Sequence, residues 1–217
     1  MPASSVTPSL LYLAAGACHV WHANLDAAPL DELRTFLSEE EKVRAARFHF
    51  EEHRVRCLAA HGMLRKILSR YLDVAPREFV FCSNEFGKPY LENTPLHWNL
   101  SHSGAEFLLA VSKHEVGIDI EKIREDIRVL EIAEAHFTAE DFASLQNLPA
   151  NERTVKFFDL WTRKEALCKG LGLGITSGLD PAGSQDWNVQ KIAAPGGYAA
   201  AIAVKGGNSD VSYHEAP

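Results

Sequence analysis

Two carboxylates stand two positions apart in the sequence: Asp119 and Glu121 belong to the segment VGIDIE, residues 116–121. On a β-strand, side chains with this spacing project from the same face. Neighbouring carboxylates repel each other unless a cation or a proton lies between them, and hard oxygen ligands of this kind suit Mg²⁺. An acidic strand end exposed to solvent would have the same pattern. The segment alone therefore leaves both interpretations open.

A second group of candidates lies in the segment FFDLWTRKEALCK, residues 157–169. On a helix, Trp161, Glu165 and Lys169 would follow one another at four-residue steps along one face. A plain surface ion pair between Glu165 and Lys169 would have the same spacing and would contribute only about 0.3–0.5 kcal/mol. The spacing by itself does not distinguish a catalytic carboxylate from such a pair.

The segment NLSHSG, residues 99–104, places polar side chains at the end of an expected strand. Asn99, Ser101 and His102 could all donate hydrogen bonds to an anion. A hydrolase built on Ser101 and His102 is disfavoured, because adjacent residues of a strand point in opposite directions. Neither Ser101 nor Ser103 lies in the GxSxG motif of a nucleophile elbow.

Basic residues gather in the first half of the chain and could bind a phosphate, which arginine can contact in bidentate fashion. They are Lys42, Arg44, Arg47, Arg54 and Lys88. The net charge of the whole chain is −7, so an anionic ligand must rely on a local cluster of this kind, and general nucleic-acid binding is not expected. A solvated helix face balanced by nearby glutamates is the alternative.

Hydrophobic periodicity and turn residues predict the elements that position these side chains. Helices are expected over 28–37, 53–72 and 129–136, from Thr138 to about Gln146, and over 151–169. Gly170, Gly172 and Gly174 are expected to end the last of these helices. Ser38 and Glu41 are expected to form a capping box at a further helix start. Strands are expected over 18–24, 79–82, 98–101, 107–112, 116–121, 187–192, 198–204 and 211–214. This order predicts an α+β protein with two similarly built halves, residues 1–113 and 114–217, without an evident sequence repeat.

The remaining features of the sequence indicate a cytoplasmic protein. Its four cysteines, Cys18, Cys57, Cys82 and Cys168, have no zinc-like spacing and are expected to be free thiols. The apolar stretch 9–18 is preceded by no Lys or Arg, so it is not expected to be a secretory signal. No apolar run approaches the roughly 20 residues that span a bilayer, and no membrane association is expected.

Four motifs in fixed order resemble those of the Sfp-type 4′-phosphopantetheinyl transferases: GKP at 87–89, NLSHSG at 99–104, VGIDIE at 116–121 and WTRKEALCKGLGLG at 161–174. The resemblance implies two α+β halves in a pseudo-twofold arrangement and a monomeric enzyme. It implies transfer of 4′-phosphopantetheine from coenzyme A (CoA) to a serine of an apo acyl or peptidyl carrier protein, with release of 3′,5′-ADP.

The same resemblance implies roles for individual residues. Asp119, Glu121 and Glu165 match ligands of Mg²⁺, for which Mn²⁺ could substitute. Glu165 and Lys169 match catalytic positions, with Glu165 as a general base for the serine. The residues that match CoA contacts are Lys42, Arg47, Arg54, Ser83, Lys88, Pro89, Asn99, Ser101, His102, Asp119 and Lys169. Two other functions stay open at this point: a Mg²⁺-dependent phosphohydrolase, and a non-catalytic protein that binds a carrier or CoA.

Overall fold

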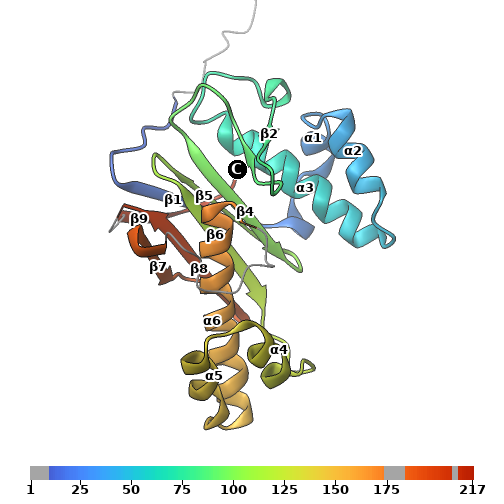
Figure 1. Ribbon diagram of the computed structural model, residues 1–217. Coiled ribbons are helices and arrows are strands. Elements are labelled where there is room, and N and C mark those ends of the chain that lie inside the picture. Colours follow the sequence, from blue (N-terminus) through green and yellow to red (C-terminus); the bar gives the residue numbers. More distant parts are fainter. Residues whose placement is uncertain (1–9, 174–183, 207–209) are drawn as a thin grey trace, which may run out of the picture.

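Two β-sheets and two long helices form the framework of the computed structural model (Figure 1), which describes residues 10–173, 184–206 and 210–217. One sheet has the strand order β4-β5-β1-β9, and the other has the order β6-β8-β7. The long helices α3 and α6 belong to different halves of the chain. The α+β class predicted from the sequence is confirmed.

The first half starts with a strand, continues with helices and returns to the sheet with two more strands. Its main elements are β1 (Ala17–Asn24), α1 (Leu30–Arg34), α2 (Glu39–Ala46), α3 (Glu51–Leu68), β4 (His97–Ser103) and β5 (Glu106–Ser112). Strand β5 pairs antiparallel with both β1 and β4. The helix α3 covers one face of this sheet, and its Leu64 and Ile67 share a core with Trp21 and Leu109.

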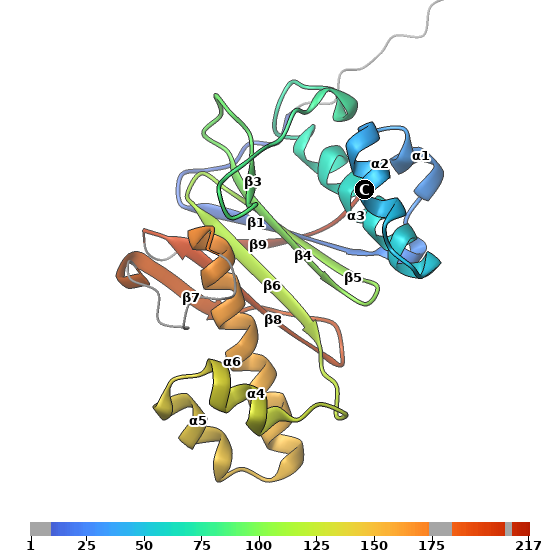
Figure 2. The ribbon, with the colours of Figure 1, turned by 45° about the vertical axis from the view of Figure 1, so that its right-hand side comes forward.

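The second half repeats this order. Its elements are β6 (Val116–Lys122), α4 (Val129–His136), α5 (Ala139–Gln146), α6 (Ala150–Leu171), β7 (Trp187–Lys191) and β8 (Tyr198–Lys205). Strand β8 pairs antiparallel with β6 and β7, as β5 does with β1 and β4. Figure 2 shows α6 running beside β6 and β8, with α4 and α5 at its N-terminal end. The two halves therefore have matching topologies, as the pseudo-twofold arrangement requires.

The last strand, β9 (Asp210–Glu215), joins the sheet of the first half and lies parallel to β1. The carbonyl of His22 accepts a hydrogen bond from the amide of Ala216, which extends this pairing past the strand. The C-terminal segment thus crosses the expected division between residues 113 and 114, and that division remains a prediction.

Helix ends follow the local signals in the sequence. The Ser38 hydroxyl accepts from the amide of Glu41, and the Glu41 carboxylate accepts from the amide of Ser38, so the predicted capping box is confirmed. Thr138 caps α5 in the same way through the amide of Asp141. Helix α6 ends at Gly172, which has a φ of +70° that other residues rarely adopt.

Two details of the predicted elements are wrong. The expected strand over 79–82 is only the short β2 (Cys82–Ser83), which pairs with β3 (Pro89–Tyr90). The carbonyls of Pro76 and Phe79 accept hydrogen bonds from the Arg65 side chain instead of from a neighbouring strand. Gly170 lies inside α6 rather than at its end, while Gly174 is outside the described residues.

Gly170 and Gly117 allow α6 to approach the second sheet closely. A Cβ atom on Gly117 would lie 2.0 Å from the carbonyl oxygen of Ala166, and one on Gly170 would lie 2.4 Å from the ring of Trp187. This close packing fixes the height of α6 above β6, the strand that carries Asp119. None of the helices in the described part of the chain is both long and apolar enough to span a membrane.

Candidate active site

The candidate site lies where β4 and β6 run side by side next to α6. Asp119 and Glu121 project from β6 on the side that faces α6, as Gly117 does. Glu165 and Lys169 lie one helical turn apart on α6, and Ser101 projects from β4. The structure therefore brings together five of the predicted side chains from three separate elements: Ser101, Asp119, Glu121, Glu165 and Lys169.

Asp119 lies at the centre of this group, and only 2% of its surface is exposed. Its Oδ1 atom accepts a hydrogen bond from the Ser101 hydroxyl at 2.9 Å and an ion-pair contact from Lys169 Nζ at 2.5 Å. Its Oδ2 atom is buried and has no hydrogen-bond partner among the described residues. A buried carboxylate oxygen without a donor is costly, so this atom is arranged for a ligand that the chain itself does not supply.

Glu165 is buried beside Asp119, with 6% of its surface exposed. Burial raises the pKa of Glu165 to about 7, with a further contribution from the charge of Asp119 that outweighs the opposing effect of Lys169. Burial and the Asp119 charge also raise the pKa of Glu121, whose Oε2 atom accepts from the Ser103 hydroxyl at 2.8 Å. The charge of Asp119 disfavours the charged forms of Glu121 and Glu165, and a cation would relieve that repulsion.

The fit of this group to a metal can be judged from its donors. No three His, Cys, Asp or Glu side chains within the described residues already have the arrangement of a complete metal site. Mg²⁺, however, usually takes one or two protein carboxylates and completes its shell with water and substrate phosphate oxygens. The buried and unpaired Oδ2 of Asp119, with Glu121 and Glu165 nearby, fits that mode of binding.

Lys169 is the cation that the structure does place in this group. Its Nζ atom contacts Asp119 Oδ1 and also donates to Ser101 Oγ at 2.9 Å. An ammonium group has three N–H donors, so one remains for a phosphate oxygen after these two contacts. Lys169 pairs with Asp119, from α6 to β6, rather than making the plain surface ion pair with Glu165 that the sequence left open.

His61 and Arg56 of α3 border the same region, and the sequence did not mark either of them as a candidate. His61 lies in the helix predicted over 53–72 and is close enough to His102 to influence its titration. Burial opposes protonation of His61, yet hydrogen bonds with Cys57 and Glu41 outweigh it and raise its pKa to about 9. Burial lowers the pKa of His102, and the charges of His61, Lys169 and Arg56 lower it further. The four-residue spacing of His53, Cys57 and His61 was the feature of the sequence that could have marked His61 as a candidate.

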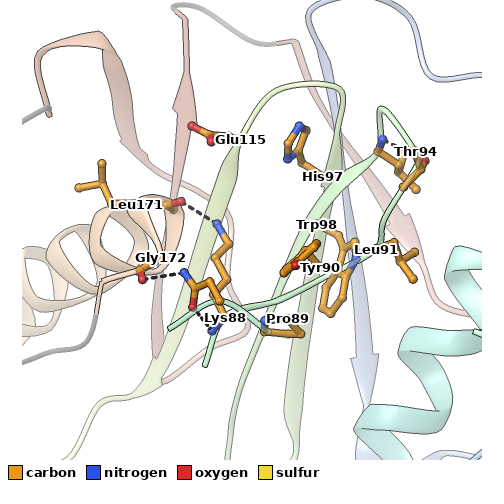
Figure 3. Close-up of a pocket in the computed structure, with 13 residues that line it drawn as sticks. Lys88, Pro89, Tyr90, Leu91, Thr94, His97, Trp98, Glu115, Leu171 and Gly172 are labelled. Carbon is orange, nitrogen blue, oxygen red and sulfur yellow. Dashed lines mark hydrogen bonds between the residues drawn. The ribbon is translucent and has the colours of Figure 1, made fainter. Parts of the chain in front are cut away.

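The turn that contains Lys88 packs against the end of α6 (Figure 3). Lys88 Nζ donates to the carbonyls of Gly170 at 2.6 Å and Val116 at 3.2 Å, and Asn84 donates to the carbonyl of Gly172. Burial lowers the pKa of Lys88 to about 8. Lys88 and Pro89 line a cavity of about 320 Å³, while Ser83 pairs with Pro89 between β2 and β3. Lys88 therefore connects the two halves.

Three of the remaining predicted contacts, Lys42, Arg47 and Arg54, belong to α2, to its C-terminal end and to α3 rather than to β4, β6 or α6. Lys42 pairs with Glu39, and Arg54 pairs with Glu51; both line a separate hollow that includes Arg34. Arg47 is an exposed residue at the C-terminal end of α2. Asn99 is buried, and its Oδ1 atom accepts from the amide of Ile118 at 2.8 Å. The structure does not bring Lys42, Arg47 or Arg54 together with the carboxylates.

Comparisons with known proteins agree on one family over nearly the whole chain. A family model described as the 4′-phosphopantetheinyl transferase superfamily matches residues 115–212. A second model, described as the N-terminal part of 4′-phosphopantetheinyl transferase, matches residues 21–114. The matches meet at the start of β6, next to the carboxylates.

Individual relatives show the same similarity. The 4′-phosphopantetheinyl transferase HetI of Nostoc sp. is 34% identical over an alignment of 218 positions, gaps included, which covers 92% of this chain and 92% of HetI. The 4′-phosphopantetheinyl transferase Sfp of Bacillus subtilis is 32% identical over 151 residues, which cover 69% of this chain and 66% of Sfp.

Proposed function

The chain belongs to the 4′-phosphopantetheinyl transferase superfamily, and we propose that Asp119, Glu121 and Glu165 hold the divalent cation of its reaction. The enzyme transfers phosphopantetheine from CoA to a carrier protein. In this reaction a serine hydroxyl of the carrier attacks the β-phosphate of CoA, and 3′,5′-ADP leaves. The observation that carries the proposal is the buried Oδ2 atom of Asp119, which has no partner in the described part of the chain and lies beside two further carboxylates.

Phosphoryl-type transfer depends mainly on positioning the phosphates and neutralising their charge. Bound Mg²⁺, or Mn²⁺ in its place, would supply positive charge to the CoA pyrophosphate. Lys169 has one donor left for a phosphate oxygen and would stabilise the departing group. Glu165 would accept the proton of the carrier serine, directly or through a water.

Cationic groups on the α3 side support binding of the remaining CoA charge. Hydrogen bonds with Cys57 and Glu41 raise the pKa of His61 to about 9, and both His61 and Arg56 lie close enough to His102 to influence its titration. We propose that these three side chains face the nucleotide part of CoA. The family-based contacts at Lys42, Arg47, Arg54, Ser83, Lys88, Pro89 and Asn99 remain predictions of the same kind.

The sequence left two other functions open, a phosphohydrolase and a non-catalytic binding protein. Because the chain belongs to a family of transferases, neither is proposed for it. CoA and an apo carrier protein are the partners that this activity implies. We further propose a monomer that acts on an acyl or peptidyl carrier in the cytoplasm. The five central side chains come from a single chain, and the four free cysteines fit a reducing compartment.

The carrier can be identified by intact mass. Purified enzyme with Mg²⁺ and CoA is incubated with a panel of apo acyl and peptidyl carriers, and each is expected to gain at most one phosphopantetheine unit. The carrier modified with the highest kcat/KM is the candidate substrate class. Absence of a gain on every carrier would contradict the proposed carrier classes.

Two substitutions test the metal site. Asp119→Ala and Glu165→Gln are each expected to lower kcat by at least about 10³-fold, which corresponds to roughly 4 kcal/mol of lost transition-state stabilisation. Both variants should also lose the Mg²⁺-dependent rise in melting temperature expected of the parent enzyme. Glu152→Gln, at an exposed position of α6, is the matched control and should leave both measurements unchanged. Near-normal turnover in either site variant would contradict the assignment.

A further inference from the structure

The edge strands β4 and β6 lie side by side, yet they belong to different sheets. Strand β6 pairs through its backbone with β8 on one side only. Successive amides of a strand point to opposite sides in the plane of the sheet, so every second amide of β6 points away from β8. These amides need acceptors from elsewhere, because a buried amide without a partner is costly.

Side chains of β4 supply those acceptors at regular intervals. Asn99 Oδ1 accepts from the amide of Ile118 at 2.8 Å. Ser101 Oγ accepts from the amide of Ile120 at 3.4 Å, and Ser103 Oγ accepts from the amide of Lys122 at 3.1 Å. Three alternate side chains of one strand thus take the place that backbone carbonyls would have in a continuous sheet.

Ser101 makes more contacts than the other two. A hydroxyl has one proton to donate and two lone pairs with which to accept. Ser101 Oγ donates to Asp119 Oδ1 at 2.9 Å and accepts from Lys169 Nζ at 2.9 Å and from the amide of Ile120. Its hydrogen-bonding capacity is therefore fully used inside the protein, and the residue is 6% exposed.

We propose that Asn99, Ser101 and Ser103 form a side-chain ladder between the two halves, and that Ser101 is a positioning residue rather than a contact of CoA. Through its hydroxyl it holds Asp119 Oδ1 and Lys169 Nζ in a fixed relation, which leaves Asp119 Oδ2 for another ligand. The catalytic part of this inference rests on the proposed function of Asp119 and Lys169, whereas the ladder itself does not.

Amide hydrogen exchange of the full-length protein tests the ladder without reference to catalysis. In Ser101→Ala the amide of Ile120 should exchange at least tenfold faster, while the amides of Ile118 and Lys122 keep their protection. In Ser103→Ala the amide of Lys122 should be the one that changes. Unchanged exchange at Ile120 in Ser101→Ala, or equal acceleration of all β6 amides, would overturn the ladder.

Steady-state kinetics and calorimetry test the positioning role. Ser101→Ala should lower kcat at least tenfold while the dissociation constant of CoA, measured in EDTA, stays within twofold of the parent value. Ser101→Thr keeps the hydroxyl and should restore most of kcat. Ser112→Ala removes a buried serine on β5 that bonds Ala17 and His114, and as the matched control it should keep kcat.

The opposite kinetic pattern would overturn the positioning role. If Ser101→Ala weakens CoA binding tenfold and leaves kcat unchanged, the hydroxyl is a CoA contact. If the parent enzyme needs no divalent cation, the proposed metal site fails, but the exchange pattern of Ile118, Ile120 and Lys122 still decides the ladder.

Discussion

Strands β1 and β6 hold equivalent places in the two halves, but their outer edges are covered in different ways. Each is the first strand of its half and pairs antiparallel on its inner side, β1 with β5 and β6 with β8. On its outer side, β1 pairs through the backbone with β9, whereas β6 receives the side chains of β4. Backbone pairing demands little of the residue types, while a side-chain ladder demands particular ones.

The difference between the two edges separates residues that mainly stabilise the fold from residues that support the proposed reaction. The edge that depends on residue type is the one beside Asp119, Glu121, Glu165 and Lys169. The first half contributes buried charge networks and the cationic groups of α3, which support the site from the other side. Substitutions in the second half should therefore affect turnover most, and substitutions in the first half should affect unfolding most.

The largest expected contrast comes from one glycine in each half. In Gly117→Ala the new Cβ would meet the Ala166 carbonyl and push α6 away from β6; in Gly62→Ala it would lie 2.6 Å from Leu33 Cβ, between α3 and α1. Both should cost about 1–3 kcal/mol of unfolding free energy. Only Gly117→Ala should lower kcat about 100-fold, because it displaces Glu165 and Lys169.

Urea denaturation and turnover per folded molecule measure this contrast. Equal losses of turnover in Gly117→Ala and Gly62→Ala would remove the proposed separation between the halves.

A buried charge network in the first half gives the next largest effect. Burial disfavours the charged form of Glu41, but hydrogen bonds from His61, Ser38 and Arg65 outweigh it and lower its pKa to about 2. Arg65 is 2% exposed, so Glu41→Gln would leave its charge buried and unpaired and should cost about 3 kcal/mol of unfolding free energy.

Urea midpoints with an unchanged m-value would report this loss, and kcat of the folded fraction should fall less than tenfold. The control is Glu39→Gln, which breaks an exposed pair with Lys42 and should not shift the midpoint. A Glu41→Gln variant as stable as its parent would show that the network does not stabilise the first half.

The smallest expected effect is on the pH dependence of stability, and it comes from the edge where β1 pairs with β9. His19 on β1 and His214 on β9 have ring centroids 4.7 Å apart, with Tyr71, Trp21 and Arg70 around them. Burial lowers the pKa of His19, with a further contribution from His214, and burial followed by Arg70 lowers the pKa of His214.

At His19 and His214 the unfolded chain therefore binds more protons than the native chain below pH 6.5, so this pair makes stability fall as the pH decreases from 7 to 5, whereas the raised pKa values of Glu121 and Glu165 act in the opposite direction. His214→Asn should weaken that acid sensitivity in urea midpoints measured at both pH values, without changing kcat at pH 7. If the urea midpoint of His214→Asn falls between pH 7 and pH 5 as much as that of the parent, the histidine pair is not the source of the acid sensitivity.

Much of the fold was predictable because its signals are local. The Ser38 capping box, the Thr138 cap and the strand expected over 116–121 depend on neighbouring residues and were confirmed. The failed strand over 79–82 depends on Arg65, which takes the carbonyls of Pro76 and Phe79 from another part of the chain. The parallel pairing of β9 with β1 is also a long-range choice that periodicity does not reveal.

The candidate site was likewise predictable where its signals are local and unpredictable where they depend on distant contacts. Motif spacing placed Asp119, Glu165 and Lys169 on the elements where the structure has them. It did not predict that Lys169 pairs with Asp119, that Lys88 bonds the backbone of Val116 and Gly170, or that the pKa of His61 is raised. Each of these depends on a contact between separate helices, strands or turns.

The position of β9 also constrains the order in which the molecule is completed. His22 and Glu215 contact each other although they are 193 positions apart. Strand β1 thus keeps one open edge until β9, far along the chain, has been synthesised. Contacts this distant close late and slowly, so the half of the molecule that is made first is expected to finish folding last.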